Sequence, residues 1–469
     1  MIEKNLSGYF SSKDTPGKGI PDFSEYTEFR VQENSSLSIA FVNGNLMSNR
    51  QNINSGMSAR VYKNGVWGFA CHPEFTKEAA GSVVKAATEN ALFLDSREKR
   101  RKPPLPEAKG EADKSFATPK KRLTQMELIA FAKEIDSFIE KNLDNLISRT
   151  VVLRNLDMEK SLITSTGTTA YTFIPRSNIM ISLSADKNGA PVELFEVFGG
   201  LGQFEDVFTD PKKLFDKISA LHTHLMKKRE GVFAQAGVKE CVLDSNLAGV
   251  LAHEALGHTT EADLILGGSV APEYLHKEAA SPLITLIDFA HTALGSTCPV
   301  PVYIDDEGTP AADAIIIDKG ILKGYLHNKE TALYFQSLPT GNARAFSFSD
   351  EPIIRMRNTA ILPGKDKLED MIESIDDGYY LVTHGNGQAD STGEFTFGVP
   401  LAYEIKKGKL GNAVLDTTIS GIAFDVLKTV TMVSDDMTWV SGGFCGKKQM
   451  IPVGMGGPAI KCNITIGGK

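Results

Sequence analysis

Two histidines and a glutamate fall within the six residues His253-Glu254-Ala255-Leu256-Gly257-His258. Imidazole nitrogens are common ligands of zinc in proteins. A familiar zinc-peptidase pattern, His-Glu-x-x-His, places both imidazoles on one face of a helix. The stretch here has one more residue between its histidines. It therefore indicates a metal site with a different backbone geometry.

The additional residue changes the angle between the two imidazoles. Each residue of an α-helix turns the chain by about 100°, so positions i and i+5 diverge by about 140°. An ideal helix would not bring both side chains to one ion. Two backbone distortions could bring both imidazoles to one ion. The helix could widen to a π-type turn, which places residue i+5 above residue i. Alternatively, it could unravel at Gly257, because glycine tolerates unusual backbone angles. We expect a distorted turn at Leu256-Gly257-His258.

The segment around the histidines has the features of a buried-faced helix. Asp244-Ser245 offers an N-cap, and Leu247, Val250 and Leu251 follow at helical spacing. The alternative is a core helix with two hydrogen-bonded histidines. With nine His in the chain, the pattern arises by chance in roughly one of a hundred such chains, an estimate from composition. A metal is favoured, but a catalytic zinc usually takes three protein ligands and a water.

Further stretches of the chain follow the motif in a recognisable order. They are Glu261 and Asp263, Asp305–Pro310, Gly324–Leu326, Arg355–Thr359, and Cys445–Lys447 followed by Pro452–Gly454. Together with His253–His258 they resemble the TldD/PmbA family of metallopeptidases, also called the modulator of DNA gyrase family. The PmbA branch lacks the His-Glu stretch, so the resemblance is to the TldD branch. Around Gly65–Phe69 the N-terminal half is similar more loosely.

The resemblance implies a zinc site completed by Cys445, which stands where the family has its third ligand. Zinc suits this mixed nitrogen and sulfur set at tetrahedral geometry, with water fourth. Glu254 would be the general base that takes a proton from the zinc-bound water. Spacing alone would make Cys445 a buried free cysteine, no better a candidate than Cys462.

Other residues have a structural alternative beside a functional one. Glu261 and Asp263 could orient the histidine rings, although acids after a helix are often simply solvated. His384, in the glycine-rich stretch Thr383–Gly387, could contact substrate or have no role. Asp305-Asp306-Glu307-Gly308 could bind a hard cation or line the substrate cleft. It lacks the spaced ligands of a calcium loop, and a turn after a strand is the simpler interpretation.

These residues are expected to be positioned by an α+β protein. Residues 1–235 are predicted to form an N-terminal α/β domain with an antiparallel sheet and long helices. Residues 236–469 are predicted to form a β-rich C-terminal domain that carries the metal-binding helix. Repeated helices and strands within 30–200 indicate an internal β-α-β duplication. Hairpin turns are expected at Asn43-Gly44 and Asn64-Gly65, helices at 76–94, 123–146 and 211–229, and strands at 149–156, 159–164 and 169–183.

The composition is that of an ordinary globular protein. Of 469 residues, 42% are hydrophobic and 23% charged, enough for two or three domains. A net charge of −8 gives no reason to expect nucleic acid or an anionic membrane as partner.

The first ten residues lack the pattern of a secretory signal, and no apolar run approaches a membrane span. Five dispersed cysteines argue against a disulfide framework, so a cytoplasmic location is expected. The basic, proline-bearing stretch 96–114 is expected to be an exposed linker.

We therefore expect a zinc-dependent peptidase that hydrolyses unfolded or extended peptides. The resemblance implies a cleft in which the peptide lies as an added strand. It also implies a PmbA-like paralogue as heterodimer partner, with a homodimer as the alternative. Two other classes remain open: a non-catalytic binding or regulatory protein of the same family, and a metal-dependent amidohydrolase with a non-peptide substrate.

Overall fold

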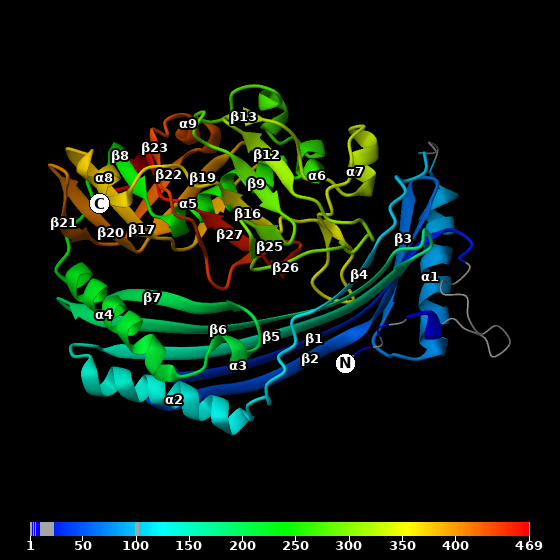
Figure 1. Cartoon of the computed structure of the whole chain (residues 1–469), viewed down its shortest axis with the longest axis horizontal. Helices are drawn as coiled ribbons and strands as arrows, with labels where there is room; N and C mark the ends of the chain where they lie inside the picture. The colour runs from blue at the N-terminus through cyan, green and yellow to red at the C-terminus, as the bar shows by residue number, and fades with distance from the viewer. Residues whose placement is uncertain (1, 3, 5, 10–22, 99–102, 469) are drawn as a thin grey trace.

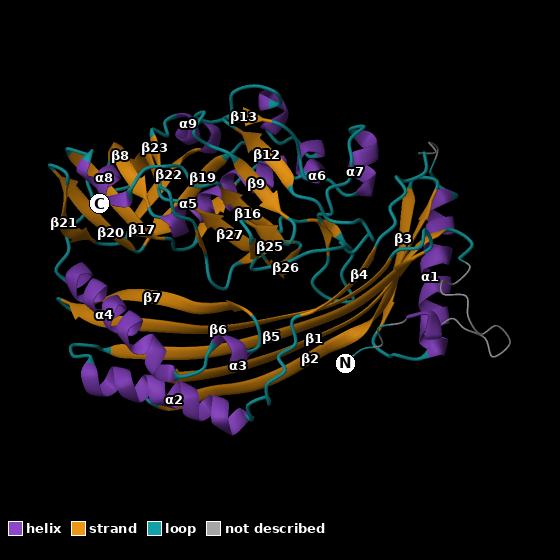
Figure 2. Cartoon of the chain, viewed as in Figure 1, coloured by secondary structure: helices purple, strands orange, loops and turns teal. Residues whose placement is uncertain are grey.

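The computed structural model describes the chain except for residues 1, 3, 5, 10–22, 99–102 and 469. The N-terminal half is a long curved sheet, and the C-terminal half lies along one face of it (Figure 1). Strands dominate both halves (Figure 2), and the predicted α+β class is confirmed. Residues 99–102, at the centre of the basic stretch, and residues 1, 3, 5 and 10 of the N-terminal segment lie outside the described residues.

The N-terminal sheet has seven strands in the order β3-β2-β1-β5-β6-β4, with β7 paired to β6. Neighbouring strands are antiparallel, apart from β4, which runs parallel to β6. β1, β2, β5 and β6 have 17 or 19 residues each, which extends them roughly 60 Å at 3.4 Å per residue. The strands are β1 (Tyr26–Val42), β2 (Asn45–Lys63), β3 (Val66–His72), β4 (Glu111–Ser115), β5 (Ser148–Thr164), β6 (Thr169–Lys187) and β7 (Ala190–Leu201).

Both predicted hairpin turns are confirmed. Asn43-Gly44 joins β1 to β2 and Asn64-Gly65 joins β2 to β3, and all four residues have positive φ angles, as a type I′ turn requires. The two strands predicted at 149–156 and 159–164 are wrong as separate elements. They form the single strand β5, because Asp157 and Met158 stay in register with both neighbouring strands instead of turning.

Three long helices cover the outer face of this sheet. They are α1 (Lys77–Asp95), α2 (Gln125–Asn142) and α4 (Phe215–Arg229). Thr76 caps α1, and Thr124 with Glu127 forms the predicted capping box of α2. The helix predicted over 211–229 begins as a 3-10 turn, Pro211–Leu214, and becomes α-helical only from Phe215. A short helix, α3 (Phe204–Val207), precedes that turn.

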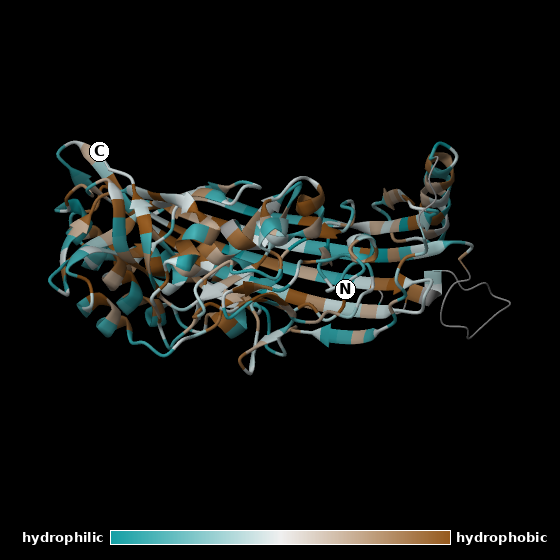
Figure 3. Cartoon of the chain, turned by 90° about the horizontal axis from the view of Figure 1, so that it is seen from above, coloured by the Kyte–Doolittle hydropathy of each residue, from teal (hydrophilic) through white to brown (hydrophobic). Residues whose placement is uncertain are grey.

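Alternation along the strands divides the sheet into two faces. Odd positions are apolar and pack against the helices: Phe29 and Val31 lie in the core with α1, and Ile39 with α2. Even positions such as Arg30 and Gln32 bond residues of the C-terminal half. Figure 3 shows the resulting mixture of hydrophobic and hydrophilic residues along the strands. The inner face of the sheet therefore carries buried polar residues beside apolar ones, and the C-terminal half lies against it.

The C-terminal half contains a nine-stranded sheet in the order β18-β19-β22-β28-β8-β17-β20-β21, with β23 on β28, and a six-stranded sheet, β13-β12-β9-β16-β27-β24. The first comprises β8 (Gly237–Leu243), β17 (Asp377–Thr383), β18 (Gly387–Ala389), β19 (Glu394–Val399), β20 (Leu401–Lys406), β21 (Lys409–Val414), β22 (Thr417–Ile422), β23 (Met432–Val433) and β28 (Ile460–Ile466). The second comprises β9 (Leu286–Phe289), β12 (Ala314–Asp318), β13 (Ile321–Leu322), β16 (Asn358–Ile361), β24 (Thr438–Trp439) and β27 (Gly454–Gly457).

Small hairpins and short helices complete this half. The two-stranded pairs are β10 (Thr292–Ala293) with β11 (Ser296–Thr297), β14 (Ala343–Arg344) with β15 (Ile353–Ile354), and β25 (Phe444–Lys447) with β26 (Gln449–Pro452). The short helices are α5 (Ser245–Leu251), α6 (Ala262–Leu266), α7 (Lys329–Tyr334), α8 (Leu368–Glu373) and α9 (Ala423–Lys428).

Helix α5, which leads into the histidine-bearing turn, packs between the two larger sheets. It contacts β8 and β17 of one sheet and β16 and β27 of the other. Gly249 lies against the backbone of Gly456, where an added Cβ would come within 2.9 Å of the Gly456 nitrogen. The absence of a side chain thus lets the helix lie directly on β27 and fixes its position.

The chain's division into domains is not settled by these contacts. β8 opens the nine-stranded sheet at Gly237, yet the core around α2 and α4 also includes Leu401 and Tyr403 from β20. The boundary at 235/236 and the internal β-α-β duplication remain predictions. Among the described helices, none has the length and apolar character needed to cross a membrane.

Candidate metal centre

The histidine pair lies where α5 widens into a π-helical turn, Ala252–Gly257. The helix begins with Asp244, whose side chain accepts a hydrogen bond from the Asn246 N–H at 3.2 Å. At the other end, the backbone N–H of His258 donates to the carbonyl oxygen of His253, which is an i→i+5 bond. The predicted departure from regular α-helix is confirmed.

The structure also distinguishes the two expected distortions. Gly257 has ordinary helical angles, φ −57° and ψ −51°, so the chain does not unravel there. The distortion begins at Ala252 rather than at Leu256, because a π turn spreads the additional residue over one whole turn. A 3-10 turn, His258–Thr260, follows.

The π turn and a hairpin distant in sequence bring three metal-ligating side chains together. Donor atoms of His253, His258 and Cys445 all lie within 4.8 Å of one another. Cys445 Sγ is 3.2 Å from His258 Nε2, and the imidazole centroids are 5.3 Å apart. Nitrogen and sulfur donors of a tetrahedral zinc site stand about 3.3–3.6 Å apart, from their bond lengths. The cluster is therefore close to the spacing that one ion requires.

His253 provides the test of whether these residues fit a metal. It is fully buried, and neither ring nitrogen has a hydrogen-bond partner among the described residues. Buried imidazoles normally recover such bonds from the protein. Burial lowers the pKa of His253 well below its usual value, so the ring is neutral, as a ligand must be. An unpaired neutral imidazole beside a thiol fits a metal ion and does not fit a hydrogen-bonded core histidine.

Cys445 is held over the histidines by a buried arginine. It lies in β25, and Arg355 donates through Nη2 to the Cys445 carbonyl at 2.7 Å. Through Nη1 the same guanidinium donates to the Gln449 carbonyl in β26 at 2.8 Å. One side chain thus binds both strands of the hairpin and fixes the position of the thiol. Residue type and spacing gave no indication of this role.

A chain of charged side chains supports His258. Its Nδ1 lies 2.9 Å from Glu261 Oε2, and Lys447 Nζ lies 3.1 Å from the same oxygen and 2.9 Å from Asp263 Oδ2. Burial opposes the charge of Glu261, but His258 and Lys447 outweigh it and hold the pKa of Glu261 below its usual value. Glu261 is fully buried and not solvated. It fixes Nδ1 of His258 and leaves Nε2 facing Cys445.

Glu254 lies beside the three donors without belonging to them. Its Oε2 is 3.7 Å from His258 Nε2, and its side chain is 27% exposed. Burial raises its pKa, and nearby Glu261 raises it further, while His258 lowers it. A partly exposed carboxylate next to a metal cluster can accept a proton from a water at that cluster.

The structure places His384 apart from this cluster. It follows β17, and its Nδ1 lies 3.4 Å from the Gly385 carbonyl oxygen. Burial lowers its pKa, so the ring is neutral near pH 7. No described contact joins it to the three donors, and its role in substrate binding remains a prediction.

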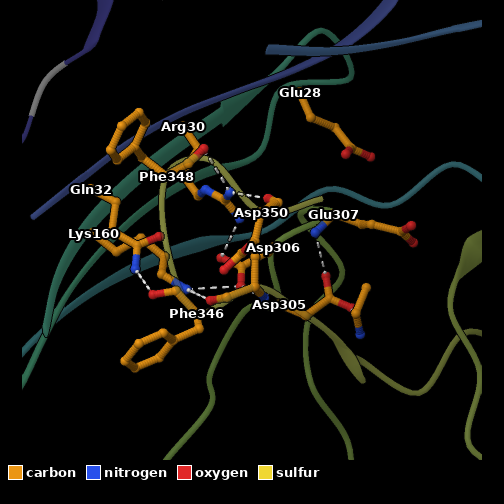
Figure 4. Close-up of polar contacts among 12 residues, drawn as sticks. Glu28, Arg30, Gln32, Lys160, Asp305, Asp306, Glu307, Phe346, Phe348 and Asp350 are labelled. Atoms are coloured by element: carbon orange, nitrogen blue, oxygen red, sulfur yellow. Dashed lines mark hydrogen bonds and ion pairs between the residues drawn. The ribbon is translucent and has the colours of Figure 1, made fainter. Parts of the chain in front are cut away.

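The acidic stretch at Asp305 is a contact between the two halves of the molecule (Figure 4). Asp305 accepts hydrogen bonds from three backbone N–H groups, at 2.8 to 3.0 Å. Asp306 lies 2.8 Å from Lys160 Nζ, and Glu307 lies 2.7 Å from Arg60 Nη1. Lys160 and Arg60 belong to the long sheet. Asp306 and Glu307 are already paired with cations, so they form no free acidic cluster for a hard cation. That this stretch lines a substrate cleft remains a prediction.

The fold and the donor cluster define a mixed α+β protein with a candidate metal centre of two histidines and one cysteine. Residues 236–468 match the PmbA/TldA metallopeptidase C-terminal domain, and residues 27–91 match PmbA/TldA metallopeptidase domain 1. The chain belongs to the PmbA/TldD family of metallopeptidases.

Individual relatives agree with this assignment. The chain is 31% identical to a metalloprotease TldD homolog of Buchnera aphidicola, over 95% of this chain and 93% of that protein. It is 30% identical to a metalloprotease of Methanothermobacter thermautotrophicus, over 96% and 97%. A zinc metalloprotease TldD homolog of Saccharolobus solfataricus is 32% identical over 62% of this chain and 65% of its own length. The crystal structure of TldE from Thermococcus kodakarensis shares the fold, with a TM-score of 0.76 at 18% identity, over 94% and 97% of the two chains.

Proposed function

We propose that this protein is a zinc-dependent peptidase that hydrolyses unfolded or extended peptides at His253, His258 and Cys445. The observation that carries the proposal is the convergence of these three donors on one point, with the carboxylate of Glu254 beside them. Two histidine nitrogens and one cysteine sulfur, with a fourth position left open, are the kind of ligand set that catalytic zinc sites use. The name of the Saccharolobus solfataricus relative, a zinc metalloprotease, supports the choice of metal.

When bound, zinc supplies a Lewis acid that polarises the peptide carbonyl and acidifies a water molecule. Glu254 accepts a proton from the attacking water and returns it to the leaving amine. Glu261 holds the Nδ1 side of His258, at 2.9 Å, so that Nε2 points to the centre. Arg355 keeps Cys445 in place through the carbonyl oxygen of that residue.

The substrate and assembly belong to the same proposal. An extended peptide can bind by adding a strand to an existing sheet edge, which recognises backbone rather than particular side chains. We propose a PmbA-like paralogue as partner, with a homodimer as the alternative, and a cytoplasmic location. A metal-dependent amidohydrolase with a non-peptide substrate would have the same metal centre, so the substrate has to be tested directly.

The decisive experiment combines metal analysis with two single substitutions. Glu254→Gln should keep one zinc per chain and lose about 10²- to 10⁴-fold in kcat/KM on an unfolded protein substrate, because an amide cannot accept the proton. Cys445→Ser is the matched variant that should lose zinc and activity together. Full activity in Glu254→Gln with verified zinc content would falsify the assignment of the base. A zinc-loaded parent protein that is inactive on all peptides would contradict the peptidase itself.

A further inference from the structure

Arg176, in β6, is a buried arginine without a counter-charge. It is 2% exposed. Its Nη1 donates to the Gly443 carbonyl oxygen at 3.3 Å, while Nε and Nη2 have no hydrogen-bond partner among the described residues. Burial, with no carboxylate to oppose it, lowers its pKa to about 10. By contrast, buried Arg60 pairs with Glu307 at 2.7 Å and buried Arg357 with Asp288 at 2.8 Å.

The unpaired guanidinium lines a cavity of about 450 Å³. The cavity lies between the inner face of the long sheet, which contributes Ser36 and Asn178, and the loop that leads into β25. Arg50 and Arg154 also line it, and no acidic residue of the described chain does. Its remaining walls are largely apolar. A volume of this size, lined by apolar side chains together with arginine, asparagine and serine side chains, is in the range of ligand sites.

A smaller space borders Arg176 on its other side. Its volume is about 60 Å³, room for about two water molecules. The larger cavity is therefore the one that can hold a ligand.

The larger cavity reaches the segment that carries Cys445. Gly442 and Phe444 line it, and Cys445 is the next residue along the chain. Arg176 bonds the carbonyl of Gly443, whose Cα is at most about 7.6 Å from that of Cys445, two peptide units away. Arg176 and the metal donors therefore contact neighbouring residues of the same segment, Gly443–Cys445.

We propose that this cavity is a substrate subsite in which Arg176 binds a carboxylate of the peptide. The carboxylate comes from either the C-terminus or an Asp or Glu side chain, and the apolar walls receive a neighbouring side chain. Arg176 can form a forked pair of charge-assisted hydrogen bonds with it through the two nitrogens that lack partners. The inference rests on the proposed peptidase function and names its substrate class.

The test measures binding separately from hydrolysis. Four N-terminally labelled apolar pentapeptides are titrated into the zinc-loaded Glu254→Gln protein. One has a free C-terminal carboxylate and one a C-terminal amide; the other two are amidated and contain Glu or Gln at the third position. Tighter binding of either carboxylate peptide than of its neutral counterpart, by about 10- to 100-fold, is expected for a charge-assisted pair. The preferred pair identifies the source of the carboxylate. Equal binding within both pairs would overturn the proposal.

Substitution of the arginine completes the test. Arg176→Met in the Glu254→Gln background should remove the preference and leave the neutral peptides' affinity within about threefold, whereas Arg176→Lys should keep part of it. Arg229→Met, which removes an arginine bonded to Glu230 at the end of α4, is the matched control and should change nothing. A preference that survives in Arg176→Met would contradict the assignment.

Two further measurements separate this inference from its alternatives. Because Arg176 is buried with no carboxylate to balance its charge, and bonds only one carbonyl oxygen, Arg176→Met should unfold at the same temperature as the parent or a higher one. A structural arginine would instead cause a loss of stability when removed. If the parent does not hydrolyse peptides, but carboxylate binding still depends on Arg176, then the peptidase function fails and the subsite stands. If the parent hydrolyses peptides but shows no carboxylate preference, then the peptidase function stands and the subsite fails.

Discussion

Glu261 is the residue on which the order of the metal centre depends most directly. Its Oε2 contacts both His258 Nδ1 and Lys447 Nζ. It is fully buried, and the two neighbours hold its pKa low although burial opposes the charge. A ligating histidine whose second nitrogen binds a carboxylate is fixed in tautomer and ring orientation.

Glu261→Gln should therefore weaken zinc binding by about 10- to 100-fold, the usual effect of losing such a partner. The measurement is zinc affinity by competition with a chromophoric chelator. Asp263→Asn is the control, because Asp263 shares Lys447 but does not contact His258. It should change the affinity by less than about threefold. Equal losses in the two variants would show that the effect comes from Lys447 and not from the histidine.

At the scale of elements, the π turn requires a glycine for a reason other than its backbone angles. Gly257 is helical, so alanine could adopt its conformation. A Cβ there would lie 1.8 Å from Met356 Sδ, however. Met356 is fully buried and is followed by β16. The turn that carries both histidines therefore packs tightly on the neighbouring sheet.

Gly257→Ala should lower the thermal unfolding midpoint and weaken zinc binding, because either Met356 or the π turn must move. Helical angles alone would have made this substitution mild. Gly81→Ala, in the exposed part of α1 where an added Cβ meets nothing within 4 Å, is the matched control and should be neutral or stabilising by up to about 1 kcal/mol. Adding Met356→Ala to Gly257→Ala should restore part of the zinc affinity. If it restores none, the contact with Met356 is not the cause.

At the scale of the whole molecule, the two halves meet through buried charges. Burial raises the pKa of Glu28 to about 7 and, together with Glu307, that of Asp305 to about 8. Both groups hold protons in the folded protein at pH values where the unfolded chain has released them. Their contribution to stability is complete below their ordinary pKa values and is lost as the pH rises through about 7 to 8.

Release of these protons should therefore lower the unfolding temperature as the pH rises from about 5 to about 8. Glu28→Gln stays neutral throughout and should reduce this fall, as followed by calorimetry at several pH values. Glu89→Gln, at an exposed position of α1, should keep the slope of the parent. An unchanged slope in Glu28→Gln would show that Glu28 does not release its proton in this range.

The sequence by itself determined the local features of this protein. The i and i+5 spacing of His253 and His258 predicted a non-regular turn, because helix geometry depends only on neighbouring residues. Asn-Gly pairs predicted the two hairpins, and Thr124 with Glu127 the start of α2, for the same reason. These features require no information about distant parts of the chain.

Only the tertiary structure decided what distant residues do together. Cys445 reaches His258 across 187 positions, and resemblance to a family, not spacing, had singled it out. Packing of the two halves decides which buried side chains find partners. It lets Arg355 bond both strands of the β25–β26 hairpin, gives Asp305–Glu307 their partners, and leaves Arg176 without a carboxylate. Such contacts leave no periodic pattern in the sequence, because the partners of a buried charge are set by packing of segments hundreds of residues apart.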